Sequence, residues 1–247
     1  MLTGILTERK FVFAASGYYG HSTTNNISEF RISIADAPVL QLARLCENHM
    51  KQISLEMELS RLTKLNNRSP LMEQYPTPPD IAAKMLYRAL GDGCLKGMTV
   101  ADLGCGNGTF AVGALMLGAE KAYAIDIDQN AISVAGENSR QFGDRIILLK
   151  EDIEEFDVPV DTILMNPPFG SQRRNADLPF IEKALEYSKD FYIVLNYKAG
   201  DFLEKVIKGK GEIIWEENIE IPLAHTYEFH RKEIKMIQAK MSRVKVW

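Results

Sequence analysis

From Thr99 onward, short apolar runs alternate with segments of helical periodicity, and this alternation limits the possible folds more than any other feature of the chain. Strand-length runs separated by helix-length segments are typical of a parallel sheet built from βαβ units. The predicted strands are Thr99–Leu103, Lys121–Ile127, Arg145–Leu149, Thr162–Met165 and Phe191–Leu195, and the predicted helices between them lie near Phe110–Leu117, Gln129–Ser139 and Leu178–Ser188.

The last third of the chain departs from this alternation. Two long strands, Glu212–Ile221 and Ile234–Val246, follow one another with no helical segment between them. An antiparallel pair at one side of an otherwise parallel sheet is the simplest arrangement for them. The sequence therefore predicts an α/β, Rossmann-like fold with a mostly parallel, seven-stranded sheet and an antiparallel C-terminal strand pair.

The residues ahead of this sheet divide into two parts. Residues 1–49 carry no motif, and we predict that they form a separable N-terminal extension. A helix is predicted from about Asp80 to Leu90, which makes residues 50–247 the main domain. Another amphipathic helix is predicted just after Met50, from four apolar residues near helical spacing: Ile53, Met57, Leu59 and Leu62.

The charge of the whole molecule gives no sign of a polyanionic partner, because the net charge over 247 residues is −4. The balance is different locally. Between Phe229 and Trp247, six Lys or Arg residues stand against one Glu. This segment is either a phosphate-facing patch or a solvated strand face.

Cysteine content and hydropathy limit the cellular compartments in which the protein is expected. The three cysteines include no C-x-x-C pair, which argues against a structural zinc site and indicates a reducing compartment. No apolar run approaches the roughly 18 residues that a membrane span requires. We therefore expect a cytoplasmic protein that binds no metal and no membrane.

A glycine-rich segment, Asp102-Leu103-Gly104-Cys105-Gly106-Asn107-Gly108-Thr109, follows a predicted strand and begins a helix. Glycines there let a ligand lie against the main chain. Asp126 ends the next strand, where a carboxylate can accept both hydroxyls of a ribose. A dinucleotide fingerprint requires G-x-G-x-x-G, whereas the order here is G-x-G-x-G. Asp102 would repel a pyrophosphate but would pair with an ammonium group, so the loop favours S-adenosylmethionine over a nicotinamide dinucleotide.

Two further residues are assigned to the same ligand. Ile127 directly follows Asp126. Asp152 follows the third predicted strand and is placed for the adenine amine of the methyl donor. A helix N-cap is the alternative for Asp152, and both readings remain open at this point.

The tetrapeptide Asn166-Pro167-Pro168-Phe169 follows the apolar strand Thr162–Met165. An exocyclic amine is a poor nucleophile because its lone pair is delocalised into the ring. A site that methylates such an amine must hold the nitrogen in line and draw its hydrogens out of the ring plane. The Asn166 side-chain oxygen and the Pro167 carbonyl can accept those hydrogens, and consecutive prolines preorganise both acceptors.

The residues after the two prolines suggest a nucleic-acid substrate. Phe169 offers a flat face on which an extruded base can stack, although a core aromatic is the alternative. Arg173 and Arg174 lie in a polar loop that could hold a phosphate backbone. The glycine loop, the ribose acid and the tetrapeptide should meet at one edge of the sheet, where doubly wound folds bind ligands.

The combination of these motifs resembles a known family. The segments Glu73-Gln74-Tyr75-Pro76-Thr77, Asp102-Leu103-Gly104-Cys105-Gly106, Asn166-Pro167-Pro168-Phe169-Gly170 and Tyr227-Glu228-Phe229-His230 together are similar to those of the methyltransferase-like protein 5 family and its archaeal relatives. The resemblance extends from about Met50 to the C-terminus and includes the segment Ala124–Asp128. Residues 1–49 have no counterpart in it.

The resemblance implies a class I methyltransferase fold and N6-adenine methylation of small-subunit ribosomal RNA. It implies that Gln74, Thr77, Gly104, Asn107, Thr109, Asp126, Asp152 and Ile153 contact the methyl donor, and that Asn166 to Phe169 hold the adenine. We group Pro168, Arg173, Arg174 and His230 with the RNA substrate. A small zinc-ribbon activator subunit, forming a heterodimer with this chain, is a further implication.

Other readings of the same residues remain. An Asn-Pro-Pro-aromatic loop also serves enzymes that methylate a guanine N2 amine or a glutamine N5 amide, because each presents a planar, conjugated nitrogen. A nicotinamide-dependent oxidoreductase conflicts with the glycine order. A catalytically silent RNA-binding module is the alternative outside the enzyme class.

Overall fold

A computed structural model describes residues 4–7, 10–13, 51–65, 77–169, 176–224 and 234–247. The chain divides into two compact units, Met1–Met50 and Lys51–Trp247. In the first unit the described residues form a hairpin of β1 (Gly4–Thr7) and β2 (Lys10–Phe13), paired antiparallel. The sequence analysis assigned no strands there. The roles of the two parts, as extension and main domain, stay predictions.

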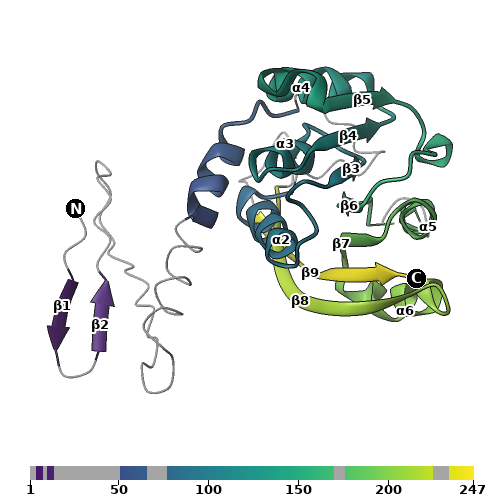
Figure 1. Cartoon of the computed structure of the whole chain (residues 1–247). Coiled ribbons are helices and arrows are strands. Elements are labelled where there is room, and N and C mark those ends of the chain that lie inside the picture. The colour runs from purple at the N-terminus through teal and green to yellow at the C-terminus, as the bar shows by residue number, and fades with distance from the viewer. Residues whose placement is uncertain (1–3, 8–9, 14–50, 66–76, 170–175, 225–233) are drawn as a thin grey trace, which may run out of the picture. The chain divides into compact units, whose positions relative to one another are not determined.

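The second unit contains a seven-stranded sheet with the order β5-β4-β3-β6-β7-β9-β8 (Figure 1). Strands β3 to β7 pair in parallel, whereas β9 pairs antiparallel with both β7 and β8. The predicted fold is therefore confirmed. The strands are β3 (Thr99–Leu103), β4 (Lys121–Asp126), β5 (Ile146–Lys150), β6 (Thr162–Met165), β7 (Asp190–Asn196), β8 (Gly211–Ala224) and β9 (Ile234–Val246).

Helices cover both faces of the sheet, and each face has its own apolar cluster. The first face packs against α2 (Pro79–Gly91), α3 (Thr109–Met116) and α4 (Gln129–Ser139). The second packs against α5 (Leu178–Tyr187) and α6 (Gly200–Ile207). In β7, Phe191 and Ile193 point to the second face and Tyr192 and Val194 to the first, as expected for a strand buried on both sides. Short 3-10 helices complete the described elements: η2 (Arg140–Arg145), η3 (Ile153–Glu155) and η4 (Tyr197–Ala199).

The first helix of this unit spans residues 51–60, close to the prediction, but its buried face differs from the predicted one. Ile53 and Met57 are 44% and 50% exposed, whereas Leu55 and Leu59 are buried. Leu55, Leu59 and Leu62 follow the i, i+4, i+7 spacing of one helical stripe, which lies against the first apolar cluster. The predicted face was wrong because it combined residues from two sides of the helix.

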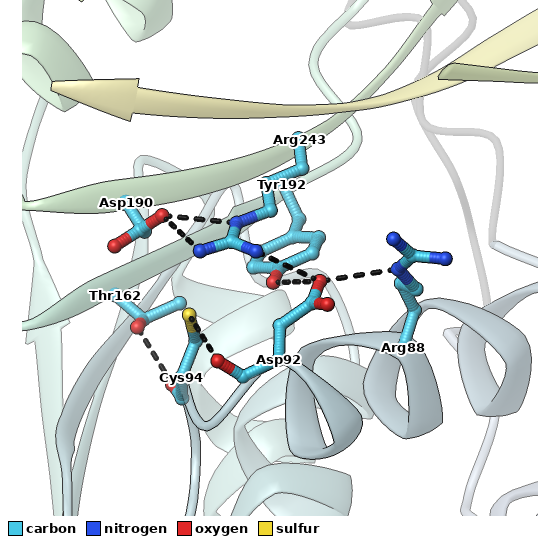
Figure 2. A network of polar contacts seen from close by, with 7 residues as sticks. All are labelled: Arg88, Asp92, Cys94, Thr162, Asp190, Tyr192 and Arg243. Atoms are coloured by element: carbon cyan, nitrogen blue, oxygen red, sulfur yellow. Dashed lines mark hydrogen bonds and ion pairs between the residues drawn. The ribbon is translucent and has the colours of Figure 1, made fainter. Parts of the chain in front are cut away.

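A polar network joins the loop after α2 to the amino-terminal ends of the central strands (Figure 2). The Arg243 guanidinium on β9 donates two hydrogen bonds to Asp190 Oδ1, at 3.0 and 2.9 Å, and its third nitrogen lies 3.2 Å from Asp92 Oδ2. The Tyr192 hydroxyl donates to the same Asp92 oxygen at 2.8 Å, and Arg88 Nε donates to it at 3.1 Å. The network therefore fixes β9 against β7 at the sheet edge opposite to the strands' carboxyl ends.

This network and a neighbouring ion pair change the reading of the basic C-terminal segment. Arg243 is paired with two carboxylates, and Lys240 Nζ lies 2.9 Å from Glu216 Oε2 on β8. Two cations of this segment, for which a phosphate-facing patch was one of the two alternatives, thus stabilise the β8–β9 pair and the sheet. Arg231 and Lys232 lie outside the described residues.

Candidate active site

The described residues enclose a cavity of about 840 Å³ at the carboxyl ends of β3 to β6. Loops from four successive parallel strands contribute to its wall: Gly104 and Gly106 after β3, Asp126 at the end of β4, Asp152 after β5 and Asn166 after β6. Doubly wound sheets bind ligands at this edge, and a cavity of several hundred Å³ suits a small-molecule ligand. The motifs recognised separately in the sequence therefore face one space.

The glycine-rich loop needs its glycines for both conformation and space. Gly104, Gly106 and Gly108 have φ values of 70°, 54° and 80°, in the left-handed region that other residues rarely adopt. A Cβ at Gly104 would lie 3.1 Å from the Phe180 ring, and one at Gly108 would lie 3.1 Å from the Ala135 Cβ. The loop can therefore present bare main chain to the cavity and still pack against α4 and α5.

Two carboxyl groups of the wall are poorly solvated. Asp102 is 2% exposed and accepts a hydrogen bond from the Ala111 N–H at 3.0 Å, and burial raises its pKa to about 8. Burial also raises the pKa of Asp126, whose two oxygens accept from Gly106 N and Asp128 N, each at 2.9 Å. The negative charge of Asp126 adds to the rise at Asp102. A cationic ligand in this cavity would relieve both effects.

Asp152 caps a short helix and also lies in the cavity wall. Its side chain caps η3 by accepting a hydrogen bond from Glu154 N at 3.0 Å, so the N-cap reading is confirmed. It also lies in the cavity wall, beside Ile153. Its contact with a donor adenine stays a prediction.

Asn166 is held at one end of its side-chain amide only. Its Nδ2 donates a hydrogen bond at 3.0 Å to Oγ1 of Thr77, a wall residue just before α2. Its Oδ1 is buried and has no hydrogen-bond partner among the described residues. An unpaired buried acceptor costs about 1–3 kcal/mol, so its presence points to a ligand group that donates to it.

Most of the residues that the sequence assigned to the site line this cavity: Thr77, Asp102, Gly104, Gly106, Asn107, Thr109, Asp126, Ile127, Asp152, Ile153, Asn166, Pro167 and Pro168. Phe169 does not line it but packs, partly buried, against the first apolar cluster. Its stacking role stays a prediction. Gln74, Arg173, Arg174 and His230 lie outside the described residues, so their roles also stay predictions.

Several wall residues were not predicted. The end of the 51–60 helix and the segment after it contribute Leu59, Leu62 and Leu65, and α5 contributes Phe180. Leu59 and Leu62 belong to the amphipathic pattern that the sequence showed, whereas Leu65 lies beyond it. Apolar spacing indicates that a helix packs, but it does not identify the surface against which the helix packs.

Asn138 on α4 holds the segment after the first helix beside the glycine loop. Its Oδ1 accepts from Thr63 N at 2.8 Å, and its Nδ2 donates to the Thr63 carbonyl at 3.1 Å and to the Asn107 carbonyl at 2.9 Å. The Asn107 side chain donates to the same Thr63 carbonyl at 3.2 Å. No sequence motif marked Asn138, because its partners are main-chain atoms far away in the chain.

The strand order, the glycine loop and the carboxyl-edge cavity define a class I methyltransferase. A sequence profile described as ribosomal protein L11 methyltransferase (PrmA) matches residues 82–167. The rRNA N(6)-adenosine-methyltransferase METTL5 of Danio rerio is 32% identical over 211 residues, which are 78% of this chain and 98% of that protein. The chain belongs to the METTL5 family.

Archaeal proteins show the same relationship. Protein MJ0284 of Methanocaldococcus jannaschii is 34% identical over 210 residues, which are 79% of this chain and 94% of that one. The crystal structure of PH1948 from Pyrococcus horikoshii, described as a candidate RNA methyltransferase, has a TM-score of 0.75 and 34% identity, and covers 79% of this chain and 98% of its own. The predicted resemblance to this family and its archaeal relatives is thus confirmed.

Proposed function

We propose that this chain transfers a methyl group from S-adenosylmethionine to the N6 amine of an adenine in small-subunit ribosomal RNA. The observation that carries the proposal is the buried, unpaired Asn166 Oδ1 in the cavity that also contains Asp102 and Asp126. The METTL5 relatives are rRNA N(6)-adenosine-methyltransferases by name, which supports the same acceptor here.

The residues of the cavity fit S-adenosylmethionine. When bound, this cofactor supplies an electrophilic methyl group on a positively charged sulfur. Asp102 is placed to hold the ammonium group, because its carboxyl is buried and lacks a cation among the described residues. Asp126 keeps acceptor capacity for ribose hydroxyls, since a carboxylate offers about four lone-pair positions and the neighbouring backbone N–H groups use only some of them. We assign Asp152 to the adenine amine and the glycine loop, Asn107, Thr109, Ile127 and Ile153 to the remaining contacts.

The acceptor side needs hydrogen-bond acceptors rather than a strong base. In the proposed reaction, Asn166 Oδ1 and the Pro167 carbonyl accept hydrogen bonds from the two N–H groups of the amine. These bonds turn the nitrogen lone pair toward the methyl carbon. The nitrogen–carbon bond forms as the carbon–sulfur bond breaks, and one amine proton leaves to water. Pro167 and Pro168 fix the main chain, so the acceptors are in place before the base arrives.

A guanine N2 amine and a glutamine amide are the competing acceptors. The PrmA profile ends at Pro167, so it covers the donor loop and little of the substrate side. The alignments with the METTL5 relatives cover nearly the whole length of those proteins. This difference in coverage favours adenine as the methyl acceptor. For the RNA we assign Pro168, Phe169, Arg173, Arg174 and His230 to substrate contacts.

The proposal is tested by methyl transfer from a labelled donor to ribosomal RNA and to ribosomal proteins, followed by nucleoside and amino-acid mass spectrometry. We expect label on N6-methyladenosine only. Asn166→Ala should lower the single-turnover rate by at least about 100-fold with donor affinity nearly unchanged. Asn218→Ala, an exposed asparagine on β8, is the control and should behave as wild type. Label on glutamine or N2-methylguanosine would overturn the assignment.

We also propose that the chain works as a heterodimer with a small zinc-ribbon activator subunit. Strand β5 lies at the edge of the sheet, and its apolar residues Ile146 to Leu149 are only partly buried. A partner strand could pair with this edge and cover those side chains. Co-expression with a zinc-ribbon protein, followed by mass measurement in solution, tests for a one-to-one complex; a chain that is fully active alone would contradict the proposal.

The proposed compartment is the cytoplasm. Cys94 and Cys105 are free and buried, as is usual where thiols stay reduced. Within the described residues, no helix combines the length and the apolar character that crossing a membrane requires.

A further inference from the structure

We infer that Thr77 is a positioning residue for methyl transfer, because it sets which end of the Asn166 amide faces the acceptor base. This inference rests on the proposed function and deepens it. The resemblance assigns Thr77 to the methyl donor, whereas the structure gives its hydroxyl a different partner: Thr77 Oγ1 accepts a hydrogen bond from Asn166 Nδ2 at 3.0 Å.

The orientation of the Asn166 amide decides whether the site can bind an amine. The amide carries an acceptor, Oδ1, and a donor, Nδ2, at nearly the same positions, and rotation by half a turn exchanges them. With Nδ2 bound to Thr77, the unpaired Oδ1 is the end available to the substrate. In the exchanged orientation, an N–H group would face the amine hydrogens and repel them.

Thr77 is well placed to hold this orientation because both partners belong to stiffened turns. Thr77 directly precedes Pro78 and Pro79, and α2 begins at Pro79. Asn166 directly follows β6, which ends at Met165, and directly precedes Pro167 and Pro168. Proline fixes its own φ and restricts the residue before it, so the main chain is rigid at both Thr77 and Asn166.

The α2 helix that follows Thr77 is anchored in the core. Ile81 is 7% exposed, and Met85 and Leu86 are fully buried in the first apolar cluster. The Ala82 N–H donates to the Pro78 carbonyl at 2.9 Å, which ties the turn to the first helical residues. The Thr77 hydroxyl is therefore held by the fold before any ligand binds, as a positioning group must be.

Two substitutions separate this role from a donor contact. Thr77→Val keeps the shape of the side chain but removes the oxygen, and Thr77→Ser keeps the oxygen but removes the methyl group. We expect Thr77→Val to lower the single-turnover rate at saturating donor by about 10- to 100-fold, because the acceptor loses its fixed orientation. The affinity for S-adenosylhomocysteine and the KM for RNA should change by less than about threefold, and Thr77→Ser should restore most of the rate.

A readout that needs no turnover accompanies the kinetics. The Asn166 Nδ2 protons of the ¹⁵N-labelled protein should exchange slowly with water in the wild type and in Thr77→Ser, and at least about tenfold faster in Thr77→Val. Ser133→Ala is the control, since it also removes a hydroxyl, but an exposed one whose hydrogen bond to the Gln129 carbonyl stays within α4. It should alter neither the rate nor the exchange.

The outcomes distinguish the inference from the proposed function. If Thr77→Val weakens cofactor affinity at an unchanged saturated rate, Thr77 is a donor contact and the inference is wrong. If the Asn166 protons exchange equally in Thr77→Val and the wild type, it is also wrong. If the wild type methylates a different acceptor, the proposed function fails, while the exchange measurement still decides whether Thr77 fixes the amide.

Discussion

At the scale of single residues, Asp102 has the clearest consequence for pH dependence. Its pKa rises from 3.8 to about 8 in the folded state, so the folded protein holds a proton that the unfolded chain releases above pH 4. The free energy of unfolding should therefore fall as the pH rises from about 4 to about 8. Asp126 contributes in the same direction, because burial raises its pKa as well.

We predict that Asp102→Asn reduces this pH dependence and weakens binding of S-adenosylmethionine. The amide can still accept from Ala111 N–H but carries no charge for an ammonium group. Denaturant unfolding at several pH values between 5 and 8 and calorimetric titration with the cofactor are the measurements. Asp144→Asn, at an exposed position in η2, should change neither. An unchanged stability slope in Asp102→Asn would mean that the carboxyl is ionised in the folded protein.

At the scale of elements, the contact between α4 and the segment after the first helix governs the cavity wall. Asn138 makes three hydrogen bonds there, and Leu65 lies close to Gly106. We predict that Asn138→Ala lowers cofactor affinity by about tenfold, because the loss of roughly 1–2 kcal/mol loosens this wall. Ser133→Ala, an exposed serine on the same helix, is the control. Equal affinity in Asn138→Ala and the wild type would show that the segment takes no part in binding.

At the scale of the whole molecule, the network of Figure 2 holds the antiparallel pair to the parallel part of the sheet. We predict that Arg243→Met lowers the free energy of unfolding by about 2–4 kcal/mol, since Asp190 loses this cation while only 15% exposed and Asp92, equally buried, keeps only its ion pair with Arg88. The matched control is Lys189→Met. It breaks an ion pair with Asp161 in which the lysine side chain is 77% exposed, and should change stability little. Similar losses in both variants would contradict a special role for the network.

The whole-molecule comparison also shows how far the sequence could lead. The central strands β3, β6 and β7 follow from their continuous apolar runs, since a strand buried on both faces leaves a continuous signal. Helix α6 was not predicted, because it directly follows β7 and η4. The cavity residues on loops were found through glycine, acid and proline positions. Thr63 and Asn138 were not, because main-chain hydrogen bonds over long separations leave no pattern in residue types.

The prolines of the cavity wall have a consequence for which nucleobases the site excludes. Pro78, Pro79, Pro167, Pro168 and Pro222 all line the cavity, and none has an N–H to offer. With the Asn166 amide held as described, a keto oxygen at the reacting position would face two acceptors, Asn166 Oδ1 and the Pro167 carbonyl. Inosine, which carries a keto oxygen where adenosine carries the amine, should therefore bind the acceptor site more weakly than adenosine, and not only remain unmethylated.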